Sequence, residues 1–390
     1  MIARILASKL LAAARQLPVV AVTGPRQSGK TTLVKNVFPG KAYVSLEDLD
    51  TREFAKSDPR GFLNNYPKGA ILDEIQRAPE LFSYLQTIVD EKQKPGMFIL
   101  TGSQQFLVME NLSQTLAGRV RILNLLPFSL EELKAAGLCP DTPEKVIYRG
   151  MYPRLFDTKI SPRDWYPDYL LTYLERDVRL IKNVGDLSTF QKFLKLCAAR
   201  TGQMLNLSSL ANECAITHNT AKAWMGVLEA SFLIHLLRPH HKNFNKRLVK
   251  LPKLYFYDTG LACALLEIEN EKQLKTYPLR GSLFETLIIS ELIKSRLNRG
   301  LPPHFYFWRD KTGHEIDCVV EQRNSLTPIE IKSSQTITAD SFKNLNYWTR
   351  ISGQKKTKAF LVYAGDAVQK RETAEVFSWK EIGTLLRKTC

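Results

Sequence analysis

The hydrophobic residues of this chain form short apolar runs that alternate with amphipathic stretches. Between residues 18 and 135, five runs of strand length are separated by segments with helical spacing, which is the pattern of a parallel α/β sheet. The predicted strands cover residues 19–23, 41–45, 69–73, 97–101 and 120–125. The segment before them predicts an amphipathic helix rather than a signal peptide, because Lys9, Arg15 and Gln16 interrupt its apolar positions.

The pattern changes twice beyond residue 140. Residues 140–240 have mostly helical spacing, and a strand-like run follows at 253–257. From Gly281 a predicted helix at 283–297 precedes strands at 304–309, 315–321, 327–332 and 358–363, which indicates a second α/β unit. A length of 390 residues also exceeds what one core ordinarily supports. We therefore expect an α/β protein with domains at 1–140, 141–245 and 246–390.

The composition restricts the classes of partner. The formal net charge of +16 favours polyanions, so nucleic acid, with DNA favoured, is the expected partner, and a generic basic surface is the alternative. No apolar run reaches the ~18–20 residues of a membrane-spanning helix, so no membrane partner is expected. The six cysteines are scattered without a C-x-x-C pair, which predicts neither a zinc site nor disulfides and indicates a reducing cytoplasmic location.

A candidate phosphate-binding loop follows the first predicted strand. Residues 24–31 read GPRQSGKT and fit the pattern G-x-x-x-x-G-K-[ST], with a strand before them and a helix after them. Glycines let backbone N–H groups converge on phosphate oxygens, Lys30 reaches the β- and γ-phosphates, and the Thr31 hydroxyl ligates Mg²⁺. The candidate nucleotide-binding residues are Gly24, Pro25, Arg26, Gln27, Ser28, Gly29, Lys30, Thr31, Thr32 and Ser103.

Polar residues that end two later strands complete the predicted nucleotide site. Asp73 and Glu74 follow an apolar strand. We expect Asp73 to hold Mg²⁺ with Thr31, and Glu74 to polarise the attacking water as a general base. Ser103 or Gln104, at the end of the next strand, can reach the γ-phosphate or that water, and ordinary turn chemistry is the alternative.

An arginine near the last predicted strand is a further catalytic candidate. Arg119 or Arg121 could offer a cation to the transferring phosphoryl group, either in the same chain or from a second copy. The alternative is a solvated arginine at the sheet edge. A role in a neighbouring chain would require a homo-oligomer, and one sequence does not fix the oligomeric state.

Five stretches in the first 155 residues occur in an informative order: TGPRQSGKTT, ILDEIQRAPEL, FILTGSQ, LAGRV and PFSLEEL. In this order they resemble the prokaryotic AAA-type ATPases that carry a poorly characterised C-terminal domain. The resemblance covers about residues 18–155. It implies an AAA-like P-loop fold and ATP rather than GTP as the nucleotide.

Residues 206–229 predict a helix, a short turn and a second helix. Leu210 packs the first helix, and Trp224 recurs at helical spacing in the second. This looks like a winged helix-turn-helix, whose second helix can enter a DNA major groove, although such modules also serve as packing domains. Lys222 is the basic residue of the second helix. Residues 238–253 hold six Lys or Arg and no acid, which predicts either phosphate contacts or a solvated loop.

Three acids and a lysine in the last domain have the spacing of a metal site. Glu285 lies in a predicted helix, Asp317 in a strand, and Glu330 with Lys332 in the next strand, where residues two apart share one face. These carboxylates would hold Mg²⁺ or Mn²⁺, and Lys332 would orient or activate a water as a catalytic residue. The set resembles the PD-(D/E)XK nuclease superfamily over about residues 281–365, which implies a restriction-endonuclease-like α/β domain. The alternative is that the acids are relics in a domain that only binds.

Together these patterns predict a protein that binds and hydrolyses ATP, acts on nucleic acid, and uses its ATP state to control a C-terminal metal-dependent nuclease-like site. One alternative is a regulatory ATPase switch whose C-terminal domain is a non-catalytic nucleic-acid- or protein-binding module. Another is an ATP-driven protein remodeller. The intact set of C-terminal acids and the basic net charge favour the first interpretation.

Overall fold

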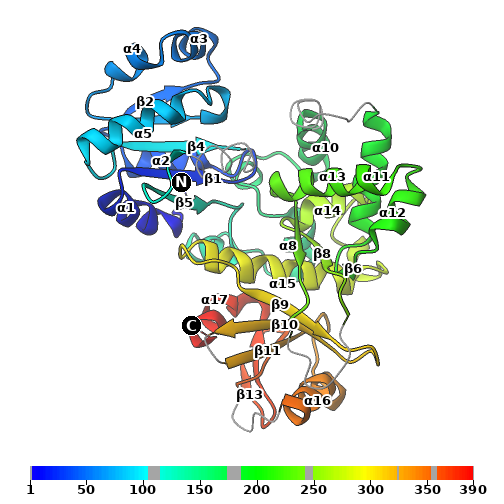
Figure 1. The fold of residues 1–390 in the computed structure, drawn as a ribbon. Helices are drawn as coiled ribbons and strands as arrows, with labels where there is room; N and C mark the ends of the chain where they lie inside the picture. The colour runs from blue at the N-terminus through cyan, green and yellow to red at the C-terminus, as the bar shows by residue number, and fades with distance from the viewer. Residues whose placement is uncertain are drawn as a thin grey trace. The chain divides into compact units, whose positions relative to one another are not determined.

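The computed structural model describes residues 2–103, 115–173, 186–241, 249–322, 325–352 and 358–389. The candidate residue Gln104, the centre of the basic stretch at 242–248 and the predicted boundary at 245/246 lie outside the described residues. The chain separates into two compact units (Figure 1). Unit 1 comprises residues 1–128, 230–232 and 296–301, and unit 2 comprises residues 129–229, 233–295 and 302–390.

Unit 1 is built around a parallel five-stranded sheet in the order β2-β3-β4-β1-β5. The strands are β1 (Val19–Thr23), β2 (Ala42–Ser45), β3 (Ala70–Asp73), β4 (Phe98–Gly102) and β5 (Val120–Asn124). The helices are α1 (Leu6–Gln16), α2 (Lys30–Val37), α3 (Leu49–Ser57), α4 (Pro59–Asn64) and α5 (Leu81–Lys92), with a 3-10 turn η1 (Ile75–Arg77). Because the strands are parallel, the carboxyl ends of β1, β3 and β4 meet at one edge of the sheet.

Helices cover both faces of this sheet. Val20 and Val22 of β1 belong to the core formed with α1 and α2, whereas Val19 and Ala21 belong to the core formed with α4 and α5. All four side chains are buried. A strand covered on both faces has no polar face, which explains why the sequence shows continuous apolar runs here rather than an alternating pattern.

The first part of unit 2 is mostly helical, as the sequence predicts. Its helices are α7 (Leu130–Ala135), α8 (Pro143–Arg149), α9 (Arg154–Asp157), α10 (Pro162–Tyr173), α11 (Leu187–Ala199), α12 (Leu207–Glu213), α13 (His218–Ala230) and α14 (Thr259–Leu265), with a 3-10 turn η3 (Gln273–Lys275). This part also contains a three-stranded antiparallel sheet with β8 at its centre. Its strands are β6 (Gln203–Met204), β7 (Ile234–Leu237) and β8 (Lys253–Phe256).

The second part of unit 2 contains a six-stranded mixed sheet in the order β13-β14-β12-β11-β10-β9. The strands are β9 (Phe305–Arg309), β10 (Glu315–Gln322), β11 (Ser325–Lys332), β12 (Phe360–Tyr363), β13 (Gln369–Lys370) and β14 (Glu375–Ser378). The other elements are α15 (Arg280–Leu297), η4 (Ala339–Phe342), α16 (Lys343–Ser352), η5 (Trp379–Glu381) and α17 (Ile382–Thr389). Leu345 and Trp348 of α16 pack into a core with Trp308, Val319 and Leu361 of the sheet.

The predicted N-terminal parallel sheet and C-terminal α/β unit are present. The strand predicted at 19–23 coincides with β1. The strands β2, β3 and β5 are one residue shorter than predicted, and β4 is shifted by one residue. The sequence pattern does not predict the short strands β6, β7, β13 and β14, because two to four residues carry too little periodicity to indicate a strand. Within the described ranges, none of the helices combines the length and apolar character needed to cross a bilayer.

Candidate functional sites

The candidate phosphate-binding loop lies between β1 and α2, at the carboxyl edge of the parallel sheet (Figure 1). Gly24 is required where the chain leaves β1, because a Cβ there would lie 2.0 Å from the Leu125 carbonyl oxygen. Gln27, with a φ of 58°, and Gly29, with a φ of 91°, turn the backbone through the left-handed region. Such a loop ahead of a helix N-terminus is the backbone arrangement that binds phosphate.

Lys30 is buried, and the loop itself holds its ammonium group. Nζ donates to the carbonyl oxygens of Gly24 at 3.0 Å and Pro25 at 2.8 Å. Both acceptors are neutral, and the positive charge of Lys30 also acts on the carboxylate of Glu74. The Ser28 hydroxyl is buried and has no hydrogen-bond partner among the described residues. A lysine on neutral acceptors and an orphaned hydroxyl fit the phosphates of a nucleotide.

Asp73, at the end of β3, gathers hydroxyl groups from three elements. Its carboxylate accepts from Thr31 Oγ1 at 3.0 and 3.2 Å, from Tyr43 Oη at 2.7 Å, and from Thr101 Oγ1. Thr31 and Asp73 therefore lie together as predicted, and they offer the oxygen ligands that Mg²⁺ prefers. The Lys35 ammonium lies 3.4 Å from the centre of the Tyr43 ring. Burial and the neighbouring Asp73 raise the pKa of Tyr43, so its hydroxyl stays a donor.

Glu74 takes a left-handed conformation with φ 56° immediately after β3. Its carboxylate accepts from Ser103 Oγ at 2.9 Å and from Gln76 Nε2, and its backbone N–H donates to Thr101 Oγ1 at 3.3 Å. Burial raises the pKa of Glu74, but the charge of Lys30 and the bonds from Gln76 and Ser103 outweigh burial and leave the pKa below its ordinary value. Glu74 is thus held as a carboxylate beside Ser103, the pair that the sequence predicts.

Arg119 does not reach this site. The strand β5 runs parallel to β1 and begins with Val120 beside Val19, whereas the loop leaves β1 at its other end. Arg119 therefore lies at the opposite edge of the sheet, and its guanidinium bonds Asp90, with Nη2 2.9 Å from Oδ2. This placement gives no support to the prediction that Arg119 acts within its own chain. A role in a second copy stays a prediction.

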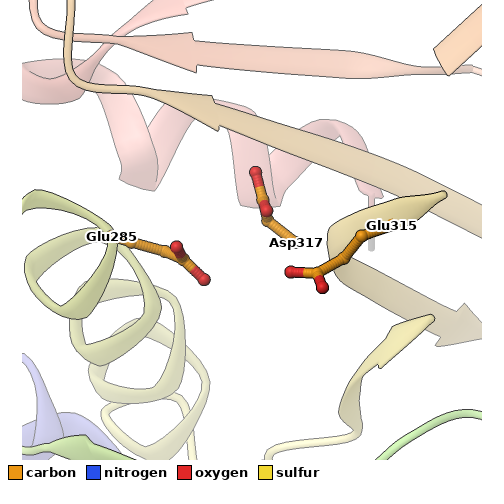
Figure 2. Close-up of side chains that lie close together, drawn as sticks. All are labelled: Glu285, Glu315 and Asp317. Carbon is orange, nitrogen blue, oxygen red and sulfur yellow. The ribbon is translucent and has the colours of Figure 1, made fainter. Parts of the chain in front are cut away.

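Three carboxylates gather where α15 passes β10 (Figure 2). Glu285 of α15 and Glu315 and Asp317 of β10 each offer an oxygen, and these oxygens lie within 4.8 Å of one another. The register of pairing between β10 and β9 changes between Ile316 and Val319. Such an irregularity changes the direction in which nearby side chains point. The sequence pattern predicts Glu285 and Asp317 as members of this cluster but not Glu315. Glu315 and Asp317 are two residues apart in a strand, so they share one face, and this spacing could have indicated Glu315.

Glu330 and Lys332 lie on β11, the antiparallel neighbour of β10. Asp317 Oδ2 accepts from the Ile331 backbone N–H at 2.8 Å. Lys332 Nζ lies 2.6 Å from Glu330 Oε1, and Asn344 Nδ2 donates to the same oxygen at 3.0 Å. Glu330 Oε2 is buried and, in the part of the chain that the structure describes, has no hydrogen-bond partner. The predicted E-x-K pair is therefore assembled beside Asp317.

Two residues of β8 also enter the acidic cluster. Lys253 Nζ lies 2.9 Å from Glu285 Oε1 and contacts the Glu315 carboxylate, and Tyr255 Oη donates to Glu285. Arg309 lies 2.8 Å from the other Glu315 oxygen. The sequence pattern predicts that Lys253 ends a basic stretch and begins a strand-like run, but it does not indicate these contacts. The available signal was a lysine and a tyrosine two residues apart in an otherwise apolar strand.

Comparison with known proteins resolves the chain into three matched segments. Residues 16–134 match a family described as an AAA domain. Residues 141–272 match a domain of unknown function (DUF8612), and residues 280–382 match another (DUF4143). The AAA match supports ATP binding and hydrolysis by the first segment.

Two curated relatives and one solved structure are similar to this chain. The uncharacterized proteins Mb2031c of Mycobacterium bovis and Rv2008c of Mycobacterium tuberculosis are each 29% identical over 335 residues, which is 85% of this chain and 74% of each relative. The Walker-type ATPase PABY2304 of Pyrococcus abyssi is 16% identical, over 67% of this chain and 94% of that chain, with a TM-score of 0.43. On the family matches, this chain carries an AAA-type P-loop ATPase domain and a C-terminal DUF4143 domain.

Proposed function

We propose that this protein hydrolyses ATP to control an action on nucleic acid, with DNA favoured, and that the action involves a C-terminal metal-dependent nuclease-like site. The observation that carries the ATP part is the assembly of Lys30, Thr31, Asp73 and Glu74 at one edge of the sheet in an AAA domain. The nucleic-acid part rests on unit 2 and on the charge of the chain.

The residues of unit 1 divide the chemistry of hydrolysis between them. Lys30 would exchange its carbonyl acceptors for phosphate oxygens, and Thr31 with Asp73 would hold Mg²⁺, which neutralises phosphate charge when bound. Glu74 would orient and polarise the attacking water. Thr101 Oγ1 donates to Asp73 and accepts from the Glu74 N–H, so one hydroxyl positions both carboxylates.

Unit 2 supplies features that favour a nucleic-acid partner. The order α11, β6, α12, α13, β7, β8 is that of a winged helix-turn-helix. His218, Asn219 and Lys222 are exposed on α13, the helix that such modules place in a major groove. Arg238 and Lys250, the described basic residues between β7 and β8, are exposed and can contact phosphates. The net charge of +16 acts in the same direction.

The last part of unit 2 supports the nuclease-like proposal. The order α15, β9, β10, β11, α16, β12 resembles a PD-(D/E)XK core. In this proposal Asp317 and Glu330 would hold Mg²⁺ or Mn²⁺, which would activate a water or polarise a phosphate, and Lys332 would orient that water. The buried, unpaired Oε2 of Glu330 fits a cation. Glu285 fits less well as a ligand because Lys253 and Tyr255 already bond it.

A second candidate function is an ATP-gated binding module without cleavage. The observation that favours it is the contact of Lys253 with two of the three clustered carboxylates, because a site with internal ion pairs has less charge left for a catalytic metal. Under this alternative the ATPase part is unchanged. The C-terminal domain would then bind nucleic acid or protein and cut nothing.

Cleavage of a mixed substrate pool distinguishes these functions. Full-length protein is incubated with single- and double-stranded DNA and RNA, with Mg²⁺ or Mn²⁺, with and without ATP. We expect metal-dependent cleavage that Lys332→Ala abolishes. Lys358→Ala, at an exposed lysine just before β12, should cleave like the wild type. If the wild-type protein cuts none of these substrates under any condition, the binding module is the function.

A further inference from the structure

The acidic cluster of Glu285, Glu315 and Asp317 already contains a cation. The Lys253 ammonium contacts both Glu285 and Glu315, and its side chain is only 4% exposed. An ion that bridged these two carboxylates would bind their oxygens at about 2.0–2.6 Å, according to whether it were Mg²⁺ or Ca²⁺. The ammonium therefore lies where such an ion would have to bind.

The small sheet of unit 2 fixes Lys253 in this position. The strand β8 is the central strand, and Lys253 pairs with Met204 of β6 on one side and with Leu237 of β7 on the other. Tyr255 lies two residues further along β8, so it shares a face with Lys253 and also bonds Glu285. The whole strand would have to shift to withdraw the ammonium from the cluster.

The charges of the cluster are matched unevenly. Lys253 contacts Glu285 and Glu315, and Arg309 contacts the second oxygen of Glu315. Three carboxylates thus meet two cations, and both cations lie on Glu285 and Glu315. Asp317 makes neither of these contacts: it faces β11 through its bond to the Ile331 N–H, and burial raises the pKa of its carboxyl group.

We propose that Lys253 is the built-in cation of this cluster and that it determines where a divalent metal ion can bind. It excludes the ion from the space between Glu285 and Glu315 and confines metal binding to Asp317 and Glu330. The reason is that the ammonium bonds the oxygens that such an ion would need and repels an ion that approaches it. At Glu330, by contrast, Lys332 bonds Oε1 only, and Oε2 has no hydrogen-bond partner among the described residues. The metal at Asp317 and Glu330 rests on the proposed function, whereas the exclusion by Lys253 does not.

Titration with Mn²⁺ in the absence of nucleotide tests this inference on the full-length protein. Free Mn²⁺ is measured by its paramagnetic resonance signal. Lys253→Met removes the ammonium and keeps the length of the side chain, so we expect Mn²⁺ to bind at least about tenfold more tightly than in the wild type. Adding Glu285→Gln to this variant should remove the gain. Lys250→Met, which removes an exposed lysine three residues earlier, should titrate like the wild type.

The outcomes separate this inference from the nuclease proposal. If a folded Lys253→Met protein, judged by its melting temperature, binds Mn²⁺ like the wild type, the inference is overturned. Where Lys253→Met fails to fold, Glu285→Gln in the otherwise native chain decides. An unchanged Mn²⁺ isotherm supports the inference, and weakened binding identifies Glu285 as a ligand and overturns it. Absence of nuclease activity would not change the interpretation of any of these Mn²⁺ titrations.

Discussion

The two carboxylate sites of this chain use a lysine in opposite ways. In unit 1, Lys30 donates to two neutral backbone carbonyls, while the carboxylate of Asp73 accepts from hydroxyl groups. In unit 2, Lys253 bonds the carboxylates of Glu285 and Glu315 directly. In the hydrogen bonds described for the first site, the Lys30 ammonium and the Asp73 carboxylate each meet neutral groups, whereas in the second site an ammonium bonds two carboxylates directly.

This difference in lysine partners determines how easily a charged ligand can bind at each site. Phosphate and Mg²⁺ can replace neutral carbonyl and hydroxyl partners at little electrostatic cost. A cation that enters the cluster of unit 2 must displace a buried ion pair, and leaving either partner of such a pair alone costs about 3–5 kcal/mol. Resemblance to a metal site in sequence therefore does not decide whether a metal binds.

Removal of Lys30 from the nucleotide site should give the largest effect, a loss of ATP affinity. Lys30→Ala deletes the donor to the β- and γ-phosphates, and each hydrogen bond to a charged group contributes about 1.5–3 kcal/mol. We expect ATP affinity to fall by about a thousandfold, measured by titration with a fluorescent nucleotide. Lys56→Ala, on the exposed surface of α3, is the matched control. Wild-type affinity in the Lys30 variant would refute the nucleotide assignment.

The base of the same site can be changed without loss of binding. Glu74→Gln keeps the contacts to Ser103 and Gln76 approximately in place but cannot accept a proton, and general-base catalysis contributes about 10²–10⁴-fold. We expect ATP affinity within about twofold of the wild type and a rate of hydrolysis lower by about a hundredfold. Steady-state phosphate release measures the rate. An unchanged rate would mean that another residue serves as the base.

Removal of a hydrogen bond to Asp73, a predicted Mg²⁺ ligand, should have a smaller effect on ATPase activity. Tyr43→Phe removes the hydroxyl that donates to Asp73 at 2.7 Å and leaves the ring under Lys35. A hydrogen bond of this kind contributes about 1 kcal/mol, so the Mg²⁺ concentration for half-maximal ATPase activity should rise by about fivefold. Tyr84→Phe, on the exposed side of α5, is the control. An effect on maximal rate alone would exclude a role at the metal.

Substitution of Arg119 should have the smallest effect on the ATPase rate. Its guanidinium bonds Asp90 at the edge of the sheet opposite the loop, and exposed ion pairs contribute only about 0–1 kcal/mol. We expect the ATPase rate of Arg119→Ala to lie within about twofold of the wild type at low protein concentration. The rate is then followed as protein concentration rises. A loss of more than tenfold at high concentration alone would establish a contribution from a second copy.

The nucleotide site could be predicted from sequence because most of its chemistry is local. The loop from Gly24 to Thr31 carries its own turn, lysine and helix start, and Asp73 and Glu74 follow a strand that is recognisable from its apolar run. Parallel strands then bring these ends together without further information. The contribution of Tyr43 was missed because the order of strands in a sheet, which sets β2 beside β3, is not encoded in either strand alone.

The C-terminal cluster was predicted only in part, since its residues come from elements far apart in the chain. Glu285, Asp317, Glu330 and Lys332 have a recognisable pattern, and the structure gathers them on neighbouring elements. Lys253 belongs to a different strand in a different sheet, and its spacing from Tyr255 in an apolar strand does not specify which carboxylates it meets. Arg119 lies close to the ATPase motifs along the chain, but it precedes the predicted strand at 120–125. In a parallel sheet the start of a strand lies at the edge opposite the loop, so its position could have been inferred from the strand direction.

The position of Lys253 has a consequence for how this protein can be divided. The DUF4143 match begins at residue 280, but the ammonium that balances Glu285 and Glu315 comes from β8, which lies within the preceding DUF8612 match. A fragment cut at the family boundary would lose Lys253 and keep Arg309 as a partner of Glu315. On the proposal that Lys253 excludes metal ions, such a fragment would bind cations that the intact chain does not, and a metal affinity measured on the isolated domain would result from the loss of Lys253.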